Sequence, residues 1–446
     1  MKGNLLLLGL VSSVLSAQAQ EQEQWSLKKC IDYAIENNID IKQRMLNTEN
    51  KEIELHTAKM SRLPDLNASI GESFGFGRST SRDGTTEDNT SSQSYLSVET
   101  SVPVFTGFRI PNQVAAKKFD LAASLEELNK AKDDVSLSIT GFYLQTLFYK
   151  ELLIISQQQV VLTKQQLEQT RLLVEAGKSP VSELYESEAQ LAKDELSLTE
   201  SLNNVNLALL DLSQALNLPV DKGFDIESPD TENMYFDENQ TLLNPLDVYA
   251  FSVEHRPAIK AAQYSLESSK KQLKVSQSYF YPTLSFGAGY SNNYFYNYNL
   301  PEGQKNTSFG SQFRNNGSES VRLSLSIPIF NRFATRNQVK QARLSIQSQQ
   351  LVLEQAKQNL FKEIQQAFYN AVASQDKYRS AEKAVKASRM AFEFEETKYK
   401  NGRSSALELS NARLRLEKSL AEEAQAKYDY VFRSKILNFY QGKPLY

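Results

Sequence analysis

Residues 329–401 read IFNRFATRNQVKQARLSIQSQQLVLEQAKQNLFKEIQQAFYNAVASQDKYRSAEKAVKASRMAFEFEETKYKN, and neither glycine nor proline interrupts them. Apolar and small residues recur along this run at spacings of three and four, which predicts one helix with a coiled-coil-like seam. The seam residues are Val339, Ala342, Ile346, Leu353, Ala356, Leu360, Ile364, Ala367 and Ala371. At about 1.5 Å per residue, roughly 65 to 70 helical residues form a rod on the order of 100 Å long. Because no compact globular domain needs such a rod, we expect an elongated, mainly α-helical molecule.

The same organisation occurs twice, because the chain contains a tandem repeat. Residues 102–105 (VPVF) match residues 327–330 (IPIF) at an offset of 225, which is 327 minus 102. The same offset places residues 177–179 (GKS) on residues 402–404 (GRS). A match that keeps one register over this distance predicts two copies of one structural unit.

The two copies differ in the length of one segment. Residues 63–66 (LPDL) align with residues 281–284 (YPTL) at an offset of 218, which is 281 minus 63. The difference of seven residues, 225 minus 218, falls between residues 66 and 102, in a stretch rich in Ser, Thr, Gly and Asn. Surface loops tolerate such changes in length, so we expect a surface loop at this position in each repeat.

Glycines mark the ends of the long helices. Gly177 and Gly402 follow them, and a left-handed residue at such a position lets the chain reverse. Further helices are predicted over residues 27–62, 180–217, 246–278 and 404–440. Two of these shorter helices stacked end to end match one long helix, so the simplest packing is a pair of long hairpins in a helical cylinder.

Segments with period-two alternation precede the long helices. In residues 94–105 and 320–330, and over about 65–77 and 282–294, apolar side chains alternate with small or polar ones. This length suits a tilted membrane strand, although a half-buried strand of a soluble protein alternates in the same way. Aromatic residues crowd the strand ends, for example at residues 279–281, and favour the membrane. Because four strands do not close a barrel and lipid excludes unpaired edges, we expect the chain to oligomerise.

The first residues have the pattern of an export signal. Lys2 is followed by an apolar segment at residues 5–15 and by the cleavage motif Ala17-Gln18-Ala19. We therefore expect a signal peptide over residues 1–19 and a mature chain that is exported. Beyond the signal, no apolar run approaches the roughly 18 residues that a membrane-spanning helix needs. Cys30 is the single cysteine and is expected to be a small helix residue without a disulfide partner.

Charge and motifs argue against two classes of function. The 446 residues include 50 Lys and Arg against 53 Asp and Glu, a net charge of -3, so no basic field favours nucleic acid as a partner. His56 and His255 lie on separate predicted helices without a cysteine or acid at metal-ligand spacing. No Walker loop, nucleophile elbow or dinucleotide fingerprint occurs. We expect a protein that is not an enzyme and that holds no cofactor or metal.

Taken in this order, the repeat, the VPVF and IPIF segments, the glycine turns and the closing residues 438–442 (NFYQG) resemble the TolC family of outer-membrane efflux proteins. The resemblance covers essentially the whole mature chain. It implies a homotrimer in the outer membrane of a Gram-negative bacterium, with a twelve-stranded β-barrel in lipid joined to a helical barrel that crosses the periplasm. It also implies an exit duct that docks onto a periplasmic adaptor (membrane fusion protein) and an inner-membrane pump of the RND or ABC type.

The resemblance divides the chain into segments. We expect a first repeat over residues 20–218, an inter-repeat linker over 219–245 and a second repeat over 246–446. By analogy with the family the linker lies in an equatorial collar around the cylinder. A plain solvated linker is the alternative.

Family members carry a tyrosine three residues before the second turn glycine, and carboxylates six and nine residues after it. These positions hold Tyr399, Glu408 and Asn411 here, and Glu183 is the equivalent acid of the first repeat. In a three-fold conduit, one inward carboxylate per chain becomes a ring of three, which attracts cations. The resemblance therefore implies a periplasmic gate of Glu183, Tyr399, Arg403 and Glu408, and Asn411 leaves a second charged ring in doubt. Exposed charges on a solvated helix face are the alternative interpretation.

The turn residues are the expected contacts for the adaptor, since they form the exposed ends of the helical hairpins. They are Gly177, Lys178, Ser179, Gly402, Arg403 and Ser404. A different class of function stays open at this point, namely an exported coiled-coil scaffold that is not a channel. Within the channel class, no residue separates small-molecule or metal efflux from protein secretion.

Overall fold

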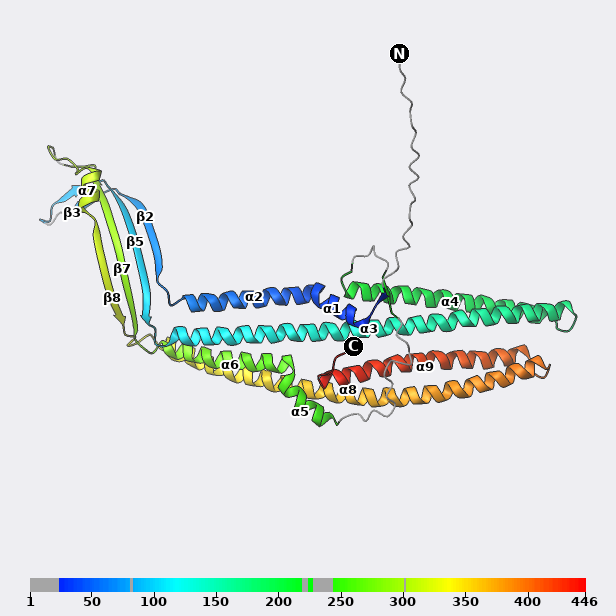
Figure 1. The fold of residues 1–446 in the computed structure, drawn as a ribbon. Helices are drawn as coiled ribbons and strands as arrows, with labels where there is room; N and C mark the ends of the chain where they lie inside the picture. Colours follow the sequence, from blue (N-terminus) through cyan, green and yellow to red (C-terminus); the bar gives the residue numbers. More distant parts are fainter. Residues whose placement is uncertain (1–23, 81–82, 219–223, 228–243, 301) are drawn as a thin grey trace, which may run out of the picture.

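The computed structural model describes residues 24–80, 83–218, 224–227, 244–300 and 302–446. The predicted signal peptide, residues 1–19, and most of the predicted linker, residues 219–245, lie outside the described residues. A long body of parallel and antiparallel helices carries a β-sheet at one end, and the turns of two helical hairpins lie at the opposite end (Figure 1).

The long helices repeat residue for residue. The helices α3 (Arg109–Glu175) and α8 (Ala334–Lys400) each have 67 residues, and their starts and ends are related by the offset of 225. The following helices, α4 (Val181–Ala215) and α9 (Ala406–Tyr440), each have 35 residues and obey the same offset. The predicted fold of two tandem repeats with long antiparallel helices is confirmed.

The shorter helices that precede the strands obey the offset of 218. They are α1 (Leu27–Asn37) and α2 (Ile39–Met60) in the first repeat, and α5 (Pro245–His255) and α6 (Pro257–Ser278) in the second. The prediction of one continuous helix in each repeat was wrong, because the chain breaks at Asn38 and Arg256. Asn38 accepts hydrogen bonds from the N–H groups of Asp40 and Ile41, at 2.9 and 3.3 Å, and so begins a new helix. Arg256 precedes a proline, which disfavours the helical conformation.

Four antiparallel strands form one sheet in the order β2-β5-β7-β8. The strands are β2 (Asp65–Gly75), β5 (Ser91–Phe105), β7 (Thr283–Asn297) and β8 (Ser318–Ser326). The last strand ends at Ser326, before the predicted limit of residue 330. Within the described chain, β2 and β8 each pair on one side only.

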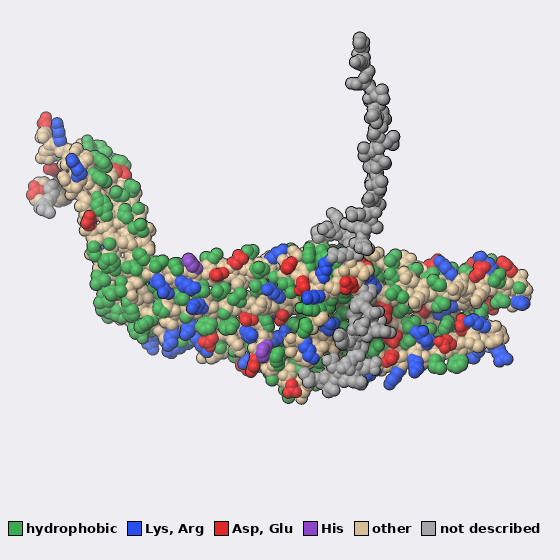
Figure 2. Space-filling model, viewed as in Figure 1, with side chains coloured by type: hydrophobic (Ala, Val, Ile, Leu, Met, Phe, Trp, Pro, Cys, Tyr) green, Lys and Arg blue, Asp and Glu red, His purple; other side chains and the backbone are tan. Residues whose placement is uncertain are grey.

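Apolar side chains cover the outside of this sheet. Leu66, Ile70 and Leu323 are 74%, 81% and 67% exposed in the single chain. Figure 2 shows hydrophobic side chains gathered over the strands and their junction with the helices, whereas charged side chains are scattered along the helical body. So much exposed apolar surface indicates that the sheet is covered by lipid or by another chain.

Short elements close the far end of the sheet. They are the hairpin of β3 (Arg78–Thr80) and β4 (Thr86–Asp88), and the helix α7 (Phe309–Asn315). Because β7 extends beyond its pairing with β8, its backbone there has a strand partner only on the β5 side. Gln312 accepts from the Phe295 N–H at 3.0 Å and donates to its carbonyl at 2.8 Å, and Asn306 bonds both groups of Asn297 in the same way, at 2.9 and 2.8 Å. Side-chain amides thus replace the missing strand.

Two of the four sheet strands, β5 and β8, lead into a long helix through a residue with a left-handed backbone. Phe108 and Phe333 begin the two helices with left-handed φ angles of 65° and 64°. Their rings pack edge-on against Phe105 and Phe330, with ring centroids 5.4 and 5.5 Å apart. The aromatic contact offsets part of the backbone strain and sets the direction in which the chain leaves the sheet.

The core is concentrated near the middle of the helical body. Its largest cluster joins α1, α3, α4 and α9 beside the short pair of β1 (Gln24–Trp25) and β6 (Asp225–Ile226). Cys30 lies in this cluster, where burial raises the pKa of its thiol to about 12. The expected absence of a disulfide agrees with this buried position.

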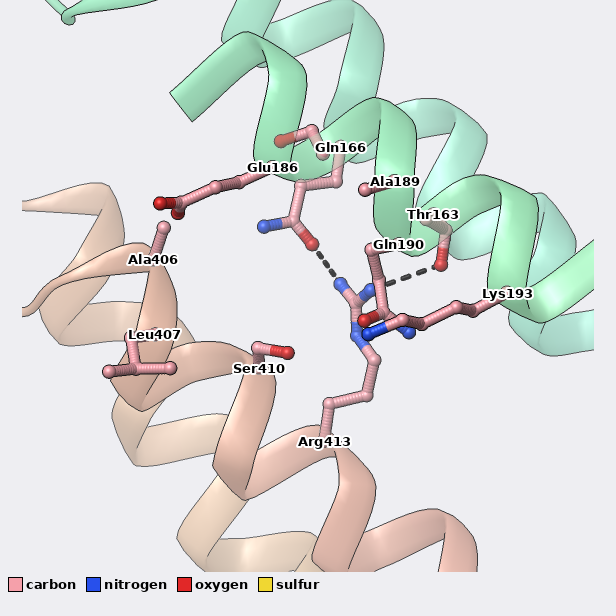
Figure 3. A pocket seen from close by; sticks show the side chains of 11 residues that line it. Thr163, Gln166, Glu186, Ala189, Gln190, Lys193, Ala406, Leu407, Ser410 and Arg413 are labelled. Carbon is pink, nitrogen blue, oxygen red and sulfur yellow. Dashed lines mark hydrogen bonds between the residues drawn. The ribbon is translucent and has the colours of Figure 1, made fainter. Parts of the chain in front are cut away.

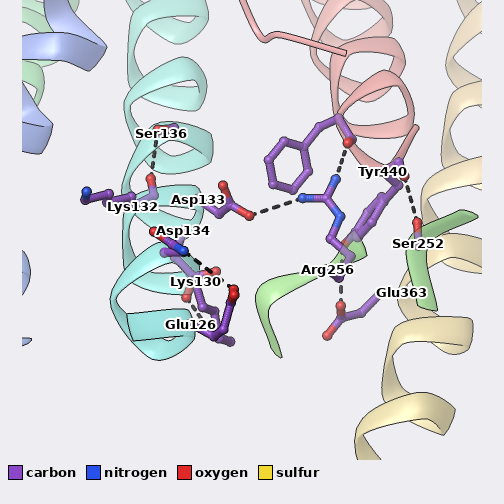
Figure 4. Close-up of polar contacts among 12 residues, drawn as sticks. Glu126, Lys130, Lys132, Asp133, Asp134, Ser136, Ser252, Arg256, Glu363 and Tyr440 are labelled. Carbon is purple, nitrogen blue, oxygen red and sulfur yellow. Dashed lines mark hydrogen bonds and ion pairs between the residues drawn. The ribbon is translucent and has the colours of Figure 1, made fainter. Parts of the chain in front are cut away.

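The second repeat is fastened to the first at the break between α5 and α6 (Figure 4). The Arg256 guanidinium lies 3.7 Å from the centre of the Phe439 ring and donates to the Phe439 carbonyl and, at 3.2 Å, to Asp133 of α3. Burial lowers the pKa of Arg256 and raises the pKa of Asp133. One side chain therefore ties together α3, the α5–α6 break and the end of α9.

Among the described residues, no helix is long and apolar enough to cross a membrane.

Candidate functional site: the hairpin tips

Both turns have the same geometry, which explains their glycines. Gly177 and Gly402 have φ angles of 68° and 67°, in the left-handed region that favours glycine. The N–H groups of Lys178 and Arg403 each donate to a helix carbonyl five residues earlier, at 2.8 Å, as in a Schellman motif. An added Cβ would meet nothing within 4 Å at either position. The glycines are thus required by backbone conformation and not by lack of space.

A cleft of about 840 Å³ separates the two hairpins next to these turns. Helices α3 and α4 form one wall, and helices α8 and α9 form the other. Its lining includes Glu183, Tyr399 and Ser404 of the predicted residues, together with Glu396 and Lys400. Arg403, Glu408 and Asn411 are described but are not among the residues that line it.

Glu183 and Tyr399 approach each other across this cleft, although they belong to different hairpins. The pKa of Tyr399 is raised, first by partial burial and then by the negative charge of Glu183. A hydrogen bond with Thr170 of α3 opposes this shift. Glu183 also accepts a hydrogen bond from Ser179 in its own turn. Glu183 and Tyr399 therefore line the same cleft within one chain, and their role in a gate stays a prediction.

Glu408 caps the first turn of α9 together with Ser405, three residues before it. Its carboxylate accepts from the Ser405 N–H at 2.9 Å, while the Glu408 N–H donates to the Ser405 hydroxyl at 3.3 Å. This capping box begins α9, and the hydrogen bonds from Ser405 and Ser404 lower the pKa of Glu408. The side chain is exposed, as are Arg403 and Asn411.

One residue at the site was missed by sequence reasoning. Arg413 lies on the buried face of α9, is 8% exposed and reaches toward Gln166 and Thr163 of α3 (Figure 3). A smaller cavity of about 270 Å³ adjoins it. The available signal was a charged residue at a seam position, four residues after the buried Leu409.

Comparisons with known proteins agree on one family. The family model described as "Outer membrane efflux protein" matches residues 30–218 and 250–442. The outer membrane protein TolC of Vibrio cholerae is 24% identical over 271 residues, which span 60% of this chain and 58% of that protein. The outer membrane efflux protein BepC of Brucella suis is 19% identical over 428 residues, 96% of this chain and 87% of that protein.

Solved structures agree on the fold. The outer membrane protein VceC of Vibrio cholerae superposes with a TM-score of 0.76, over 94% of this chain and 97% of that chain. Its sequence is 17% identical, so the likeness concerns the fold alone.

Proposed function

The chain belongs to the outer membrane efflux protein family, and from this premise we propose that three copies of it enclose one conduit that closes at the hairpin tips. It is an efflux channel of the Gram-negative outer membrane and not an enzyme. The resemblance to the TolC family is confirmed, and a scaffold that is not a channel does not agree with this membership.

The open edges of the sheet support closure by several copies, and membership in the family supports the number three. In lipid, the free edges of β2 and β8 would leave backbone groups without hydrogen bonds, which costs several kcal/mol for each group. Pairing β8 of one copy with β2 of the next satisfies both edges. Three copies then supply 3 × 4 strands, twelve in all, which exceeds the minimum of about eight for a closed barrel.

We place the closed end of the conduit at the hairpin tips. Glu183 and Tyr399 support this, because both line the cleft between the two hairpins beside their turns. Arg403 and Glu408 are exposed in the single chain and are therefore free to contact a neighbouring copy or to face the conduit. Asn411 carries no charge, so the acids of this gate are Glu183 and Glu408, and position 411 adds no further charged ring.

The exposed turns are the proposed contacts with the rest of the machinery. Residues 177–179 and 402–404 protrude at the end farthest from the sheet (Figure 1) and fit a periplasmic adaptor, a membrane fusion protein. A passive duct supplies no energy, so an inner-membrane pump of the RND or ABC type must drive transport through it. Outer-membrane lipid would surround the sheet.

The gate is tested by removing one charge while keeping the helix cap. The Glu408→Gln variant retains an oxygen that can accept from Ser405 and loses the negative ring. We expect the detergent-purified oligomer in a planar bilayer to show weaker block by Mg²⁺ than the unmodified protein. Glu422→Gln on the exposed face of α9 is the matched control and should change nothing. If Mg²⁺ block is the same in all three proteins, Glu408 does not belong to the gate.

A further inference from the structure

A buried charged cluster lies above the tip turns, between the two hairpins. Arg413 of α9 donates through Nη1 to the Thr163 hydroxyl at 3.0 Å and through Nη2 to the Gln166 side-chain carbonyl. Thr163 in turn donates to Asp194 of α4 at 2.5 Å. Asp194 is 6% exposed and Thr163 is 2% exposed. A continuous chain of hydrogen bonds thus runs from α9 through α3 to α4.

The cluster contains a second acid that is not hydrogen-bonded. Glu417 lies one helical turn beyond Arg413 on α9, and its Oε1 atom is buried without a hydrogen-bond partner among the described residues. The Arg413 Nε atom is buried and unpartnered in the same way. With Asp194 and Glu417 ionised, two negative charges face one positive charge. If Glu417 is protonated, the cluster becomes neutral and its carboxyl group gains a donor.

We propose that Arg413, Asp194 and Glu417 form a proton-controlled clasp that holds α9 against the α3–α4 hairpin, fastened at low pH and loosened as the pH rises. The clasp concerns contacts between hairpins of one chain and deepens the proposed gating, on which its role in transport rests. Its residues are distinct from the predicted gate and from the turns.

The charges around Glu417 favour its protonated form, as a clasp that is fastened at low pH requires. Burial and, to a smaller extent, the Asp194 charge raise the pKa of Glu417 to about 7, against the opposing effect of Arg413. Helix α8 contributes Glu396, which is paired with Lys400 at 2.9 Å. Helix α3 contributes only the uncharged Thr163 and Gln166 to the contacts of Arg413.

Two more charged residues of α4 lie near the cluster. Lys193 and Glu186 line the small cavity beside Arg413 and lie at opposite ends of it (Figure 3). Among the described residues that line this cavity, none forms an ion pair with Glu417.

The sign of the pH effect follows from linkage. In the fastened state Glu417 is buried and binds its proton up to about pH 7, whereas in a loosened state it is hydrated and its pKa returns toward the ordinary 4.5. The fastened state therefore holds the proton more tightly. The free-energy difference that favours the fastened state is therefore largest below pH 4.5, and it decreases as the pH rises through 7.

The test measures the separation of the hairpins directly. Spin labels are placed on the two turns through Lys178→Cys and Arg403→Cys, and the distances between them in the purified oligomer are measured by pulsed electron paramagnetic resonance. Samples are diluted with unlabelled chains so that distances within one chain dominate. Cys30 stays in place, because burial prevents its labelling. We expect the distance distribution to widen between pH 5 and pH 8.5, with most of the change between pH 5 and about 7.

Two variants decide whether Glu417 is responsible. Glu417→Gln imitates the protonated acid and should remain narrow across the whole pH range, while Glu422→Gln should keep the transition. A transition in Glu417→Gln like that of the unmodified protein, or no transition in the unmodified protein, would overturn the clasp. Because this readout does not depend on current, a normal distance transition with unchanged Mg²⁺ block in Glu408→Gln would reject the gate and leave the clasp standing.

Discussion

At the scale of single residues, side chains near the tips cap helices and form buried hydrogen bonds that their position in the sequence does not reveal. Glu408 occupies the position of a gate acid and also caps α9. Arg413 occupies a seam position where an apolar residue is expected, and only the fold shows that Thr163, Gln166 and Asp194 receive it. The turn glycines were predicted from the sequence because local spacing is sufficient for them, whereas Tyr399 was named only through the resemblance to the family. Partners that are 250 residues apart have no local signal.

The buried thiol offers a prediction at this scale. Cys30 is fully buried, and its pKa of about 12 leaves almost no thiolate at pH 8. We expect iodoacetamide to alkylate Cys30 only after unfolding, with a rate in the native protein at least one hundred times lower. A Lys178→Cys variant provides an exposed thiol as the positive control. Rapid native alkylation of Cys30 would mean that the cluster around α1 opens readily.

At the scale of elements, the predicted helices and repeats follow from glycine and proline spacing and from the two constant offsets. The breaks at Asn38 and Arg256 were missed, because a single extended residue leaves the apolar periodicity on both sides intact. The left-handed Phe108 and Phe333 were missed because bulky residues rarely adopt that conformation. The amide caps on β7 also escaped prediction, since a polar stretch does not show which backbone groups it will bind.

The second turn gives a prediction at the scale of elements. Gly402→Ala forces a Cβ into the left-handed conformation and should cost roughly 1 to 2 kcal/mol, although no neighbour is in the way. Hydrogen exchange of the amides in the turn should become about 5 to 30 times faster. Gly402→Asn is the matched variant, because asparagine tolerates this conformation, and it should lie close to the unmodified protein. Equal exchange rates in all three proteins would show that the left-handed conformation at residue 402 does not determine the stability of the turn.

At the scale of the whole molecule, a single chain leaves its β-sheet open at both edges. Its sheet has two free edges and an exposed apolar face, while its helices form a long body that ends in two exposed turns. The alternation of the strands was visible in the sequence, and the need for further copies followed from it by the physics of strand edges in lipid. How the copies pair depends on a register between chains, which a pattern within one chain does not contain.

Electron microscopy of the detergent-purified oligomer tests the central claim most directly, since symmetry and strand closure are visible in the same reconstruction. We expect a three-fold particle in which β8 of each chain pairs with β2 of the next, joined to a helical cylinder on the order of 100 Å long. A particle without three-fold symmetry, or a sheet whose edges stay unpaired, would contradict it.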